Sequence, residues 1–373
     1  MYKKILVISS DYTGNGHKSI TEALAEQFDR HGGVTVQIID GYSLSGSLGI
    51  RIGKMYGVIT RTSKELYRLM WDISTIKPEL LVELIEYSIT ERFLKLLSPS
   101  IPDAIIVTHP NFNGSVLNIL EKNNIKIPLF AMVADPVSIT PLWADARADF
   151  TICPTQEARG KCLEFGVPDS RIKVFGFPIR QKFCRVAASG SAPASYETEN
   201  PLRCMIMSGG EGSGNMRRIA GILLKNFNCT VKIVCGRNKI LKKSLEQGLG
   251  DKYGGRVEIL GFTDRIQELM LKSDVLFTRA SPNTMMEAVM CNVPLVITGA
   301  LPGQEEGNPA FALKHGLGTV CMQASELKQV VGSLLAGRAD LLNKIKGSQY
   351  GYRNPDSAAN IVEFILSRGS QSL

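Results

Sequence analysis

The sequence lacks most of the features that mark membrane-spanning, disulfide-stabilised or metal-dependent proteins. No apolar run approaches the ~20 residues of a membrane-spanning helix. The 8 cysteines include no C-x-x-C pair, and most lie in apolar surroundings, so we expect reduced thiols rather than disulfides or metal ligands. There is no D-x-D motif, so a metal-bridged diphosphate is not indicated. The P-loop pattern G-x-x-x-x-G-K-[ST] is absent too, which excludes that class of phosphate site.

What is present is the composition of an ordinary soluble globular protein, with 44% hydrophobic and 21% charged residues. The formal net charge of +8 favours an anionic partner: nucleic acid, acidic lipid headgroups or a phosphorylated substrate. The first residues, Met1 to Ile8, include a short apolar run without a small-residue cleavage site. They predict a buried strand rather than a signal peptide, and a cytoplasmic protein.

Short apolar runs rich in β-branched residues alternate with helical patterns along the chain. Continuous apolar strands separated by helices predict parallel sheets covered on both faces, an α/β fold. The expected strands are 5–9, 35–40, 104–108, 129–134 and 150–153, then 204–207, 231–235, 257–260, 275–278, 295–298 and 318–321.

A stretch of small and polar residues at 186–200 divides this pattern and predicts a linker. Residues 1–185 would form one domain and residues 201–353 a second, each with a glycine-rich turn after its first strand. Residues 354–373 would form a C-terminal helix that can return to the first domain. We expect that helix to start at Asn354-Pro355-Asp356, with proline at its first position.

Residues 44–97 interrupt the alternation with a long helical pattern. A basic amphipathic helix is typical of a segment lying on an anionic membrane surface. The alternative is a solvated face packed on its own domain, although the apolar residues are too many for a helix surrounded by water alone. The basic residues that would meet an anionic membrane are Arg51, Lys54, Arg61, Lys64 and Arg68.

The turn Gly14-Asn15-Gly16-His17 follows the first expected strand and begins a helix. Its glycines let a ligand approach the backbone, and helix N-terminal amides attract anions. The dinucleotide-binding fingerprint G-x-G-x-x-G is incomplete, because Ser19 occupies the position of its third glycine. Asp40 ends the next expected strand, where it only mimics the acidic residue that binds the ribose in that motif. We expect His17 to face solvent with a near-neutral pKa, as a general base for an acceptor hydroxyl. The alternative is a histidine that merely bonds a loop carbonyl.

Two further polar residues, Asp135 and His109, end expected strands on the edge where α/β proteins bind ligands. Asp135 is a candidate base or a group that orients the acceptor. Its alternative role is a turn cap on Pro136.

The second half carries a separate set of candidate ligand-binding residues. The loop 209–214 can cradle phosphate with backbone N–H groups. Glu287 lies about one turn inside a helix that follows a strand, where a carboxylate can accept both hydroxyls of a ribose or simply complement the helix dipole. Gln304 and Glu305 are free to meet sugar hydroxyls. The donor-binding candidates are Gly209, Gly210, Glu211, Gly212, Ser281, Asn283, Thr284, Glu287, Gln304 and Glu305.

These segments, taken in order, resemble the family of monogalactosyldiacylglycerol synthases and processive diacylglycerol glucosyltransferases. That family is related to the N-acetylglucosaminyltransferase of peptidoglycan synthesis. Each segment is unspecific alone, whereas five in order are specific. They are Gly14-Asn15-Gly16-His17 (family G-x-G-H), Ala134-Asp135 with Trp143 (T-D-…-W), Gly176 to Phe183 (G-[IL]-P-[IV]-R-x-x-F), Gly209–Gly214 (G-G-G-E-G) and Thr284 to Asn308 (the sugar-nucleotide signature).

The resemblance implies a GT-B fold, a UDP-sugar donor, and diacylglycerol or a related lipid as acceptor, with inversion at the anomeric carbon. It implies that His17 and Asp135 act on the acceptor side, together with Gly14, Asn15, Gly16, His109 and Trp143. It also implies that Phe262 lies where the family holds uracil, and that UDP-sugar is a substrate, with no cofactor and no metal. The protein would lie peripherally on the inner leaflet of the cell membrane and would bind no nucleic acid.

The sequence departs from the family at three positions. Thr140 stands at about the position where the family often has a histidine, which puts acceptor identity or a catalytic assist in question. Asn283 stands where the family has a glycine before the helix, and Ser208 replaces the first glycine of the loop. Two rival functions keep the same two-domain plan: a hydrolysing UDP-sugar epimerase and a non-catalytic UDP-sugar-binding protein. A nicotinamide dehydrogenase is disfavoured by the missing third glycine.

Overall fold

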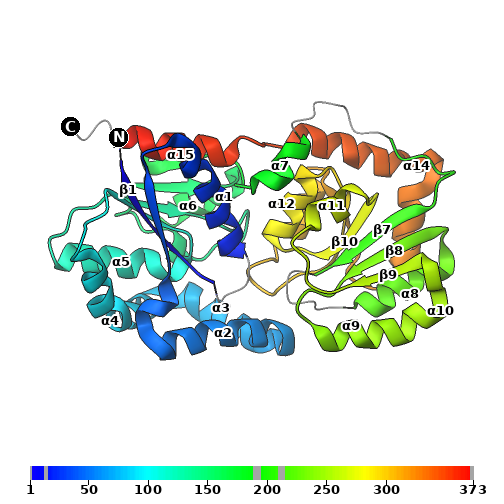
Figure 1. Ribbon diagram of the computed structural model, residues 1–373, viewed down its shortest axis with the longest axis horizontal. Helices are drawn as coiled ribbons and strands as arrows, with labels where there is room; N and C mark the ends of the chain where they lie inside the picture. The colour runs from blue at the N-terminus through cyan, green and yellow to red at the C-terminus, as the bar shows by residue number, and fades with distance from the viewer. Residues whose placement is uncertain (1, 12–15, 188–194, 209–214, 370–373) are drawn as a thin grey trace. The chain divides into compact units, whose positions relative to one another are not determined.

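The computed structural model describes residues 2–11, 16–187, 195–208 and 215–369, apart from the side chains of Arg61, Val186 and Ala187. The chain divides into two compact units (Figure 1). The first contains Met1–Gln181, Pro302–Gln304 and Asp356–Leu373, and the second contains Lys182–Leu301 and Glu305–Pro355. Each unit is described by itself.

The first unit is built on a six-stranded parallel sheet with the order β2-β1-β3-β4-β5-β6. Its central strands are apolar on both faces, as Ile5, Leu6, Val7 and Ile8 of β1 show, because helices cover both sides. The direction of the strand order reverses between β1 and β3. The strands are β1 (Lys4–Ser9), β2 (Thr35–Asp40), β3 (Ala104–Val107), β4 (Leu129–Met132), β5 (Phe150–Cys153) and β6 (Ile172–Val174).

The helices of this sheet follow the alternation expected from the sequence. The α-helices are α1 (Gly16–His31), α5 (Pro110–Lys122), α6 (Gln156–Glu164) and α15 (Ser357–Arg368), with short 3-10 helices η2 (Pro141–Trp143) and η3 (Asp169–Arg171). The C-terminal helix α15, red in Figure 1, packs against α1. The short helix α7 (Gln181–Ala187) crosses the boundary between the two units.

Four helices fill the segment between β2 and β3: η1 (Gly41–Ser45), α2 (Gly46–Thr62), α3 (Lys64–Ile76) and α4 (Pro78–Leu97). The Ser63 hydroxyl accepts the Leu66 amide at 3.1 Å and so begins α3. Proline at position 78 begins α4. Helix α4 buries Ile89, Phe93 and Leu97 in the core cluster shared with β1, β3 and α5, which anchors the insertion to the domain.

The second unit has its own six-stranded parallel sheet, with the order β12-β11-β10-β7-β8-β9 and a reversal between β7 and β10. Its core cluster is separate from that of the first unit. The strands are β7 (Leu202–Met207), β8 (Cys229–Val234), β9 (Val257–Leu260), β10 (Val275–Arg279), β11 (Leu295–Gly299) and β12 (Gly318–Val320). The main helices are α8 (Met216–Asn226), α9 (Lys239–Leu245), α11 (Ile266–Leu271), α12 (Pro282–Met290), α13 (Asn308–Lys314) and α14 (Leu327–Tyr352).

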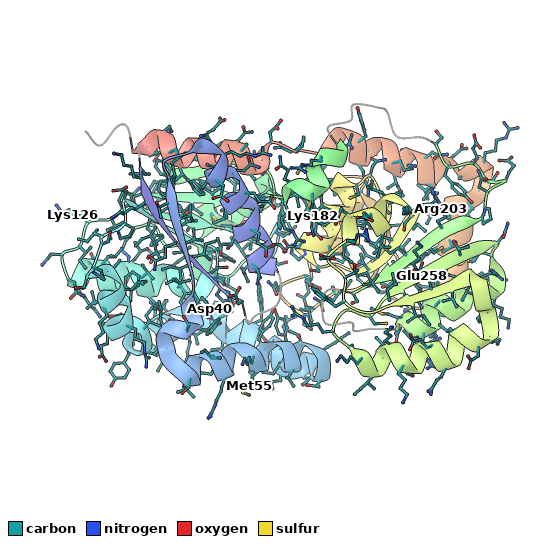
Figure 2. The ribbon with its side chains drawn as sticks, in the orientation of Figure 1. Asp40, Met55, Lys126, Lys182, Arg203 and Glu258 are labelled. Atoms are coloured by element: carbon teal, nitrogen blue, oxygen red, sulfur yellow. The ribbon has the colours of Figure 1, made fainter. Side chains whose placement is uncertain are left out.

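Two charged side-chain pairs of this unit include residues labelled in Figure 2. Arg203 on β7 pairs with Asp274, with Nη2 and Oδ1 2.5 Å apart, and Glu258 on β9 pairs with Lys232 on the neighbouring strand at 3.3 Å. Opposite charges on adjacent strands contribute modestly to sheet stability. All eight cysteines are free and have no disulfide.

Two details of the sequence prediction were wrong. The last helix begins at Ser357 with Asp356 as its N-cap residue, so Pro355 precedes the helix instead of occupying its first position. The edge strand β6 was not predicted, because its three residues, Ile172-Lys173-Val174, are too short to show a period.

Candidate active site

The sequence-predicted acceptor residues of the first unit gather at the reversal of its strand order. His17 lies in the first turn of α1, which follows β1, and His109 directly precedes α5, which follows β3. Strands β1 and β3 pair in register, with Ile8 opposite Val107, so the residues after them meet at one edge. The two imidazole rings are 4.4 Å apart between centroids. This is the edge at which open α/β sheets bind ligands.

His17 has a defined tautomer. Its Nδ1 lies 2.6 Å from the carbonyl oxygen of Thr108, and because a carbonyl only accepts, Nδ1 carries the proton and Nε2 keeps its lone pair. Burial lowers the pKa of His17 to about 4, against the opposing effect of the Thr108 hydrogen bond. The prediction that His17 faces solvent with a near-neutral pKa was therefore wrong, because its side chain is only 9% exposed. The α1 start folds back against β3, which the sequence alone did not reveal.

His109 is held from the opposite direction. Its Nδ1 accepts the backbone N–H of Asn111 at 3.3 Å, and it thereby caps α5. The proton of its neutral form then lies on Nε2. Burial, together with the neighbouring His17, lowers the pKa of His109 well below its ordinary value. Both rings are consequently neutral at physiological pH.

Asp135 follows β4 and is 3% exposed. The indole Nε1 of Trp143 donates to its Oδ2 at 3.1 Å, and the indole ring lies 6.2 Å from the ring of His17. The predicted residues His17, His109, Asp135 and Trp143 thus form one buried cluster. Thr140 is also buried, and its backbone carbonyl accepts the N–H of Trp143 at 3.1 Å.

Gln304 belongs with the first unit by its contacts. Its Nε2 donates to Asp135 Oδ1 at 2.9 Å, and its Oε1 accepts from the hydroxyl of Tyr67 at 2.5 Å and of Tyr56 at 3.2 Å. Gly303 has a φ of +78°, and a Cβ at this position would overlap the indole of Trp71. Glycine is required here for both reasons. Gln304 therefore bonds the carboxylate of Asp135 in this structure.

In the second unit, helix α12 begins next to the reversal of strand order, directly after β10. Pro282 occupies the first turn, and Ser281, the N-cap residue, makes no side-chain cap hydrogen bond. Thr284 and Glu287 are buried, at 5% and 7% exposure, and Asn283 is half-buried. The Nδ2 of Asn308 donates to the Ala280 carbonyl at 2.8 Å and so ties α13 to the turn before α12. This arrangement leaves helix N-terminal amides able to receive an anion.

Glu305 has a structural partner that the sequence did not reveal. Its carboxylate lies 2.9 Å from Nε of Arg279 and accepts the backbone N–H of Leu301 at 2.8 Å, with the Glu305 side chain 3% exposed. Burial raises the pKa of Glu305, and Arg279 opposes this shift. The pair fixes the loop that follows β11.

Phe262 follows β9 and is 59% exposed, with the Arg237 guanidinium 5.1 Å from its ring centroid. An exposed ring under a guanidinium offers a face for stacking.

The remaining predicted glycines and their neighbours, Gly14, Asn15, Gly209, Gly210, Glu211 and Gly212, lie outside the described residues. Gly16 begins α1. Among the described residues, no group of three or more His, Cys, Asp or Glu side chains could hold a metal ion.

Asp40 does not act as the ribose acid that its position mimics. Its carboxylate accepts the backbone N–H groups of Asp11 at 2.6 Å and of Ser43 at 2.9 Å, and so caps η1 at the end of β2 (Figure 2). Sequence reasoning also missed Thr108, Tyr42, Asn111 and Arg279, which orient the residues described above. The only sequence signal for Thr108 and Arg279 was that each is a polar residue at the end of an apolar strand, β3 and β10 respectively.

Helices α2 and α3 expose a large apolar face. Met55, labelled in Figure 2, is 57% exposed on α2, and Ile76 on α3 is 74% exposed. The basic residues Arg51, Lys54, Lys64 and Arg68 on the same helices are exposed. Spacings of three and four residues place the exposed apolar residues on one face of each helix: Leu48, Ile52, Met55 and Val58, then Leu66, Leu69, Met70, Ile73 and Ile76. Within the described residues, none of the helices has the length and apolarity needed to cross a membrane.

Two family models match the chain. Residues 17–179 match the monogalactosyldiacylglycerol (MGDG) synthase model, and residues 216–350 match the glycosyltransferase family 28 C-terminal domain. Two parallel sheets with these matches define a glycosyltransferase of the GT-B fold, as predicted. These matches confirm the resemblance to the family of monogalactosyldiacylglycerol synthases and processive diacylglycerol glucosyltransferases.

Relatives match over nearly the whole chain. The processive diacylglycerol beta-glucosyltransferase of Bacillus subtilis (strain 168) is 28% identical over 98% of this chain and 95% of its own length. Monogalactosyldiacylglycerol synthase 2 of Arabidopsis thaliana is 25% identical over 97% of this chain and 80% of its own length.

Solved structures share the fold at low identity. MurG of Acinetobacter baumannii has a TM-score of 0.62 at 16% identity, covering 98% of this chain and 99% of its own. The UDP-GlcNAc 2-epimerase of Neisseria meningitidis, bound to UDP-GlcNAc, has a TM-score of 0.59 at 13% identity, covering 98% and 100%. The fold alone does not separate transferases from epimerases, whereas the sequence relatives are transferases.

Proposed function

We propose that the protein transfers a hexosyl group from a UDP-sugar to the hydroxyl of diacylglycerol or a similar lipid, with inversion at the anomeric carbon. The observation that carries the proposal is the buried His17, whose Nδ1 bonds Thr108 while Nε2 keeps its lone pair. A neutral imidazole with its lone pair on Nε2 can accept a hydroxyl proton as the acceptor oxygen attacks. The names of the sequence relatives, diacylglycerol glucosyltransferase and monogalactosyldiacylglycerol synthase, support the acceptor class.

In the proposed reaction His17 is the base. The lipid oxygen attacks the anomeric carbon and forms the new C1–O bond as its proton passes to His17 Nε2. The bond between C1 and the phosphate oxygen breaks on the opposite face, and its electron pair leaves on UDP. Attack from the face opposite the leaving group inverts the configuration.

Asp135 suits an orienting role better than a basic one. Both its oxygens already accept hydrogen bonds, Oδ2 from Trp143 and Oδ1 from Gln304. Trp143 and Gln304 are both donors to this carboxylate, so the hydrogen bonds hold its orientation. We therefore assign the proton transfer to His17 and the support of the Trp143 indole to Asp135.

On the donor side we assign the diphosphate to the amides at the start of α12, near Ser281, Asn283 and Thr284. Helix N-terminal amides stabilise the charge that develops on leaving UDP, so no metal or cofactor is invoked. Glu287, inside the same helix, would accept the ribose hydroxyls, and the exposed face of Phe262 would lie beside the uracil. Solved proteins of this fold include one in complex with UDP-glucose, which supports the donor class.

The exposed face of α2 and α3 suits an anionic membrane. Its apolar residues would enter the boundary between headgroups and acyl chains, while each nearby lysine or arginine adds about 1 kcal/mol of attraction. A peripheral position on the inner leaflet brings the lipid hydroxyl to the same domain that carries His17. The alternative interpretation, in which these helices simply face water, does not explain why residues such as Leu48 and Ile76 are exposed together.

A donor panel tests the function. Incubation with UDP-hexoses and diacylglycerol in mixed micelles should give a hexosyl-diacylglycerol by mass spectrometry, and anomeric coupling in its NMR spectrum should show the β configuration from an α-linked donor. UDP-sugar incubated without lipid is the control. A changed sugar in that control, with no glycolipid from any lipid acceptor, would contradict the proposal and favour an epimerase.

A further inference from the structure

The neighbouring rings of His17 and His109 carry opposite hydrogen-bonding groups at their Nε2 atoms. Thr108 takes the Nδ1 proton of His17, which leaves an acceptor at Nε2, and Asn111 donates to Nδ1 of His109, which leaves an N–H donor at Nε2. The ring centroids are 4.4 Å apart. No other hydrogen-bond partner of either ring lies among the described residues.

The His109 ring is held rigidly. The edge of Tyr42 packs at 5.5 Å and Phe112 at 5.4 Å, measured between ring centroids. The side chain of Asn111 donates to the Tyr42 hydroxyl at 2.9 Å, while its backbone N–H bonds His109. A donor fixed this firmly discriminates strongly between ligands, because an unmet buried N–H is costly.

We propose that His109 is a specificity-determining residue for the acceptor: its Nε2–H donates to an oxygen on the carbon next to the one that carries the reacting hydroxyl. The inference rests on the proposed function. Oxygens on adjacent carbons are spaced closely enough to meet two rings in contact, one at His17 Nε2 and one at His109 Nε2–H. An ester of glycerol has this pair of oxygens, and so does a sugar with adjacent hydroxyls. A simple fatty alcohol lacks it.

The test compares two acceptors that differ at the carbon next to the one that carries the reacting hydroxyl, where one has an oleoyl ester and the other only hydrogen. Dioleoylglycerol has this ester, and the oleoyl monoester of 1,3-propanediol has a reacting hydroxyl without it. The readout is the ratio of kcat/KM for the two acceptors. We expect the wild type to favour dioleoylglycerol by about tenfold beyond what chain number accounts for. In His109→Phe the ratio should fall to the value that the difference in the number of acyl chains alone accounts for, through a rise in KM for dioleoylglycerol.

Two other His109 variants separate the donor from the ring. His109→Gln places an amide N–H near the position of Nε2 and should keep most of the preference. His109→Asn reaches only the position of Nδ1, keeps a good cap for α5 and should lose the preference. It also replaces His109→Phe if the latter does not fold. His315→Phe is the matched control, because His315 packs against Phe311 and Tyr352 in the second unit and should leave the ratio unchanged.

The outcomes separate this inference from the proposed function. Wild-type selectivity in both His109→Phe and His109→Asn would overturn the role of His109 and leave the transferase proposal standing. A wild-type protein that glycosylates neither acceptor would overturn the proposed function, and the His109 role with it.

Discussion

The imidazole of His17 donates its Nδ1 proton to the carbonyl oxygen of Thr108, 2.6 Å away, and this one contact decides which nitrogen is available for chemistry. Thr108 follows β3 and His17 follows β1, so the pairing of two adjacent strands sets the tautomer. The imidazole that we propose as the base is thus aligned by the sheet, and a rigid element holds a reacting group more exactly than a loop does.

The pH dependence of the rate should reflect the burial of this pair. Because burial lowers the pKa of His17 to about 4, the base stays neutral at pH 6, where an exposed histidine would be largely protonated. We expect kcat/KM for glycolipid formation to change less than twofold between pH 8 and pH 6. A fall that follows a group with a pKa near 6.5 would contradict this assignment.

Stability should fall in acid for the same reason. The folded pKa of His17 lies below the unfolded value of 6.5, so its unfolded form binds the proton more readily. The contribution of His17 to stability is complete above pH 6.5 and is lost as the pH falls from 6.5 towards 4. His109 has the same direction of shift. Urea midpoints measured from pH 7.5 to pH 5 should fall less in His17→Phe than in the wild type.

Removal of Glu287 should weaken the donor site selectively. Because Glu287 is buried within α12 and is assigned to the ribose hydroxyls, Glu287→Ala should reduce UDP affinity by about tenfold to a hundredfold, as loss of charged hydrogen bonds does. Calorimetry with UDP gives the affinity. Glu258→Ala, which removes an exposed carboxylate on β9, is the control. Unchanged UDP binding in Glu287→Ala would exclude the ribose role.

The hydrogen bond from Trp143 to Asp135 should be worth more than an exposed one. Both side chains are buried, and the bond is charge-assisted, so a double-mutant cycle with Trp143→Phe and Asp135→Asn should give a coupling of about 1.5–3 kcal/mol in the free energy of unfolding. Chemical denaturation followed by fluorescence measures it, with Trp71 as the remaining tryptophan reporter. Additive effects of the two substitutions would show that the contact carries no net energy.

Membrane binding should depend on charge at one place. Replacement of Arg51, Lys54, Arg61, Lys64 and Arg68 by glutamine should reduce sedimentation with anionic liposomes at least tenfold, since each contributes about 1 kcal/mol. The control replaces five exposed basic residues of the second unit, Arg218, Lys225, Lys239, Lys243 and Lys272, for the same change in net charge. An equal loss of liposome binding in both variants would mean that net charge alone attracts the protein to the membrane. No loss in the variant of α2 and α3 would favour the alternative that these helices simply face water.

The sequence predicted more of the fold than of the site geometry. Apolar runs such as Ile5 to Ile8 are long enough to mark buried parallel strands, so the α/β class and most strand positions could be predicted. The surroundings of single side chains could not, because they depend on residues distant in sequence. His17 is buried by Thr108 and His109, and Glu305 by Arg279, 26 positions away. No local pattern contains such pairings.

The account depends most on His17 as the base of a hexosyl transfer, and a side-by-side turnover measurement tests this directly. Wild type and His17→Ala are supplied with one UDP-hexose and dioleoylglycerol, and UDP affinity is measured on the same preparations. We predict a fall in kcat of about a hundredfold or more with the UDP dissociation constant unchanged. Wild-type turnover in His17→Ala, or loss of UDP binding together with turnover, would contradict the account.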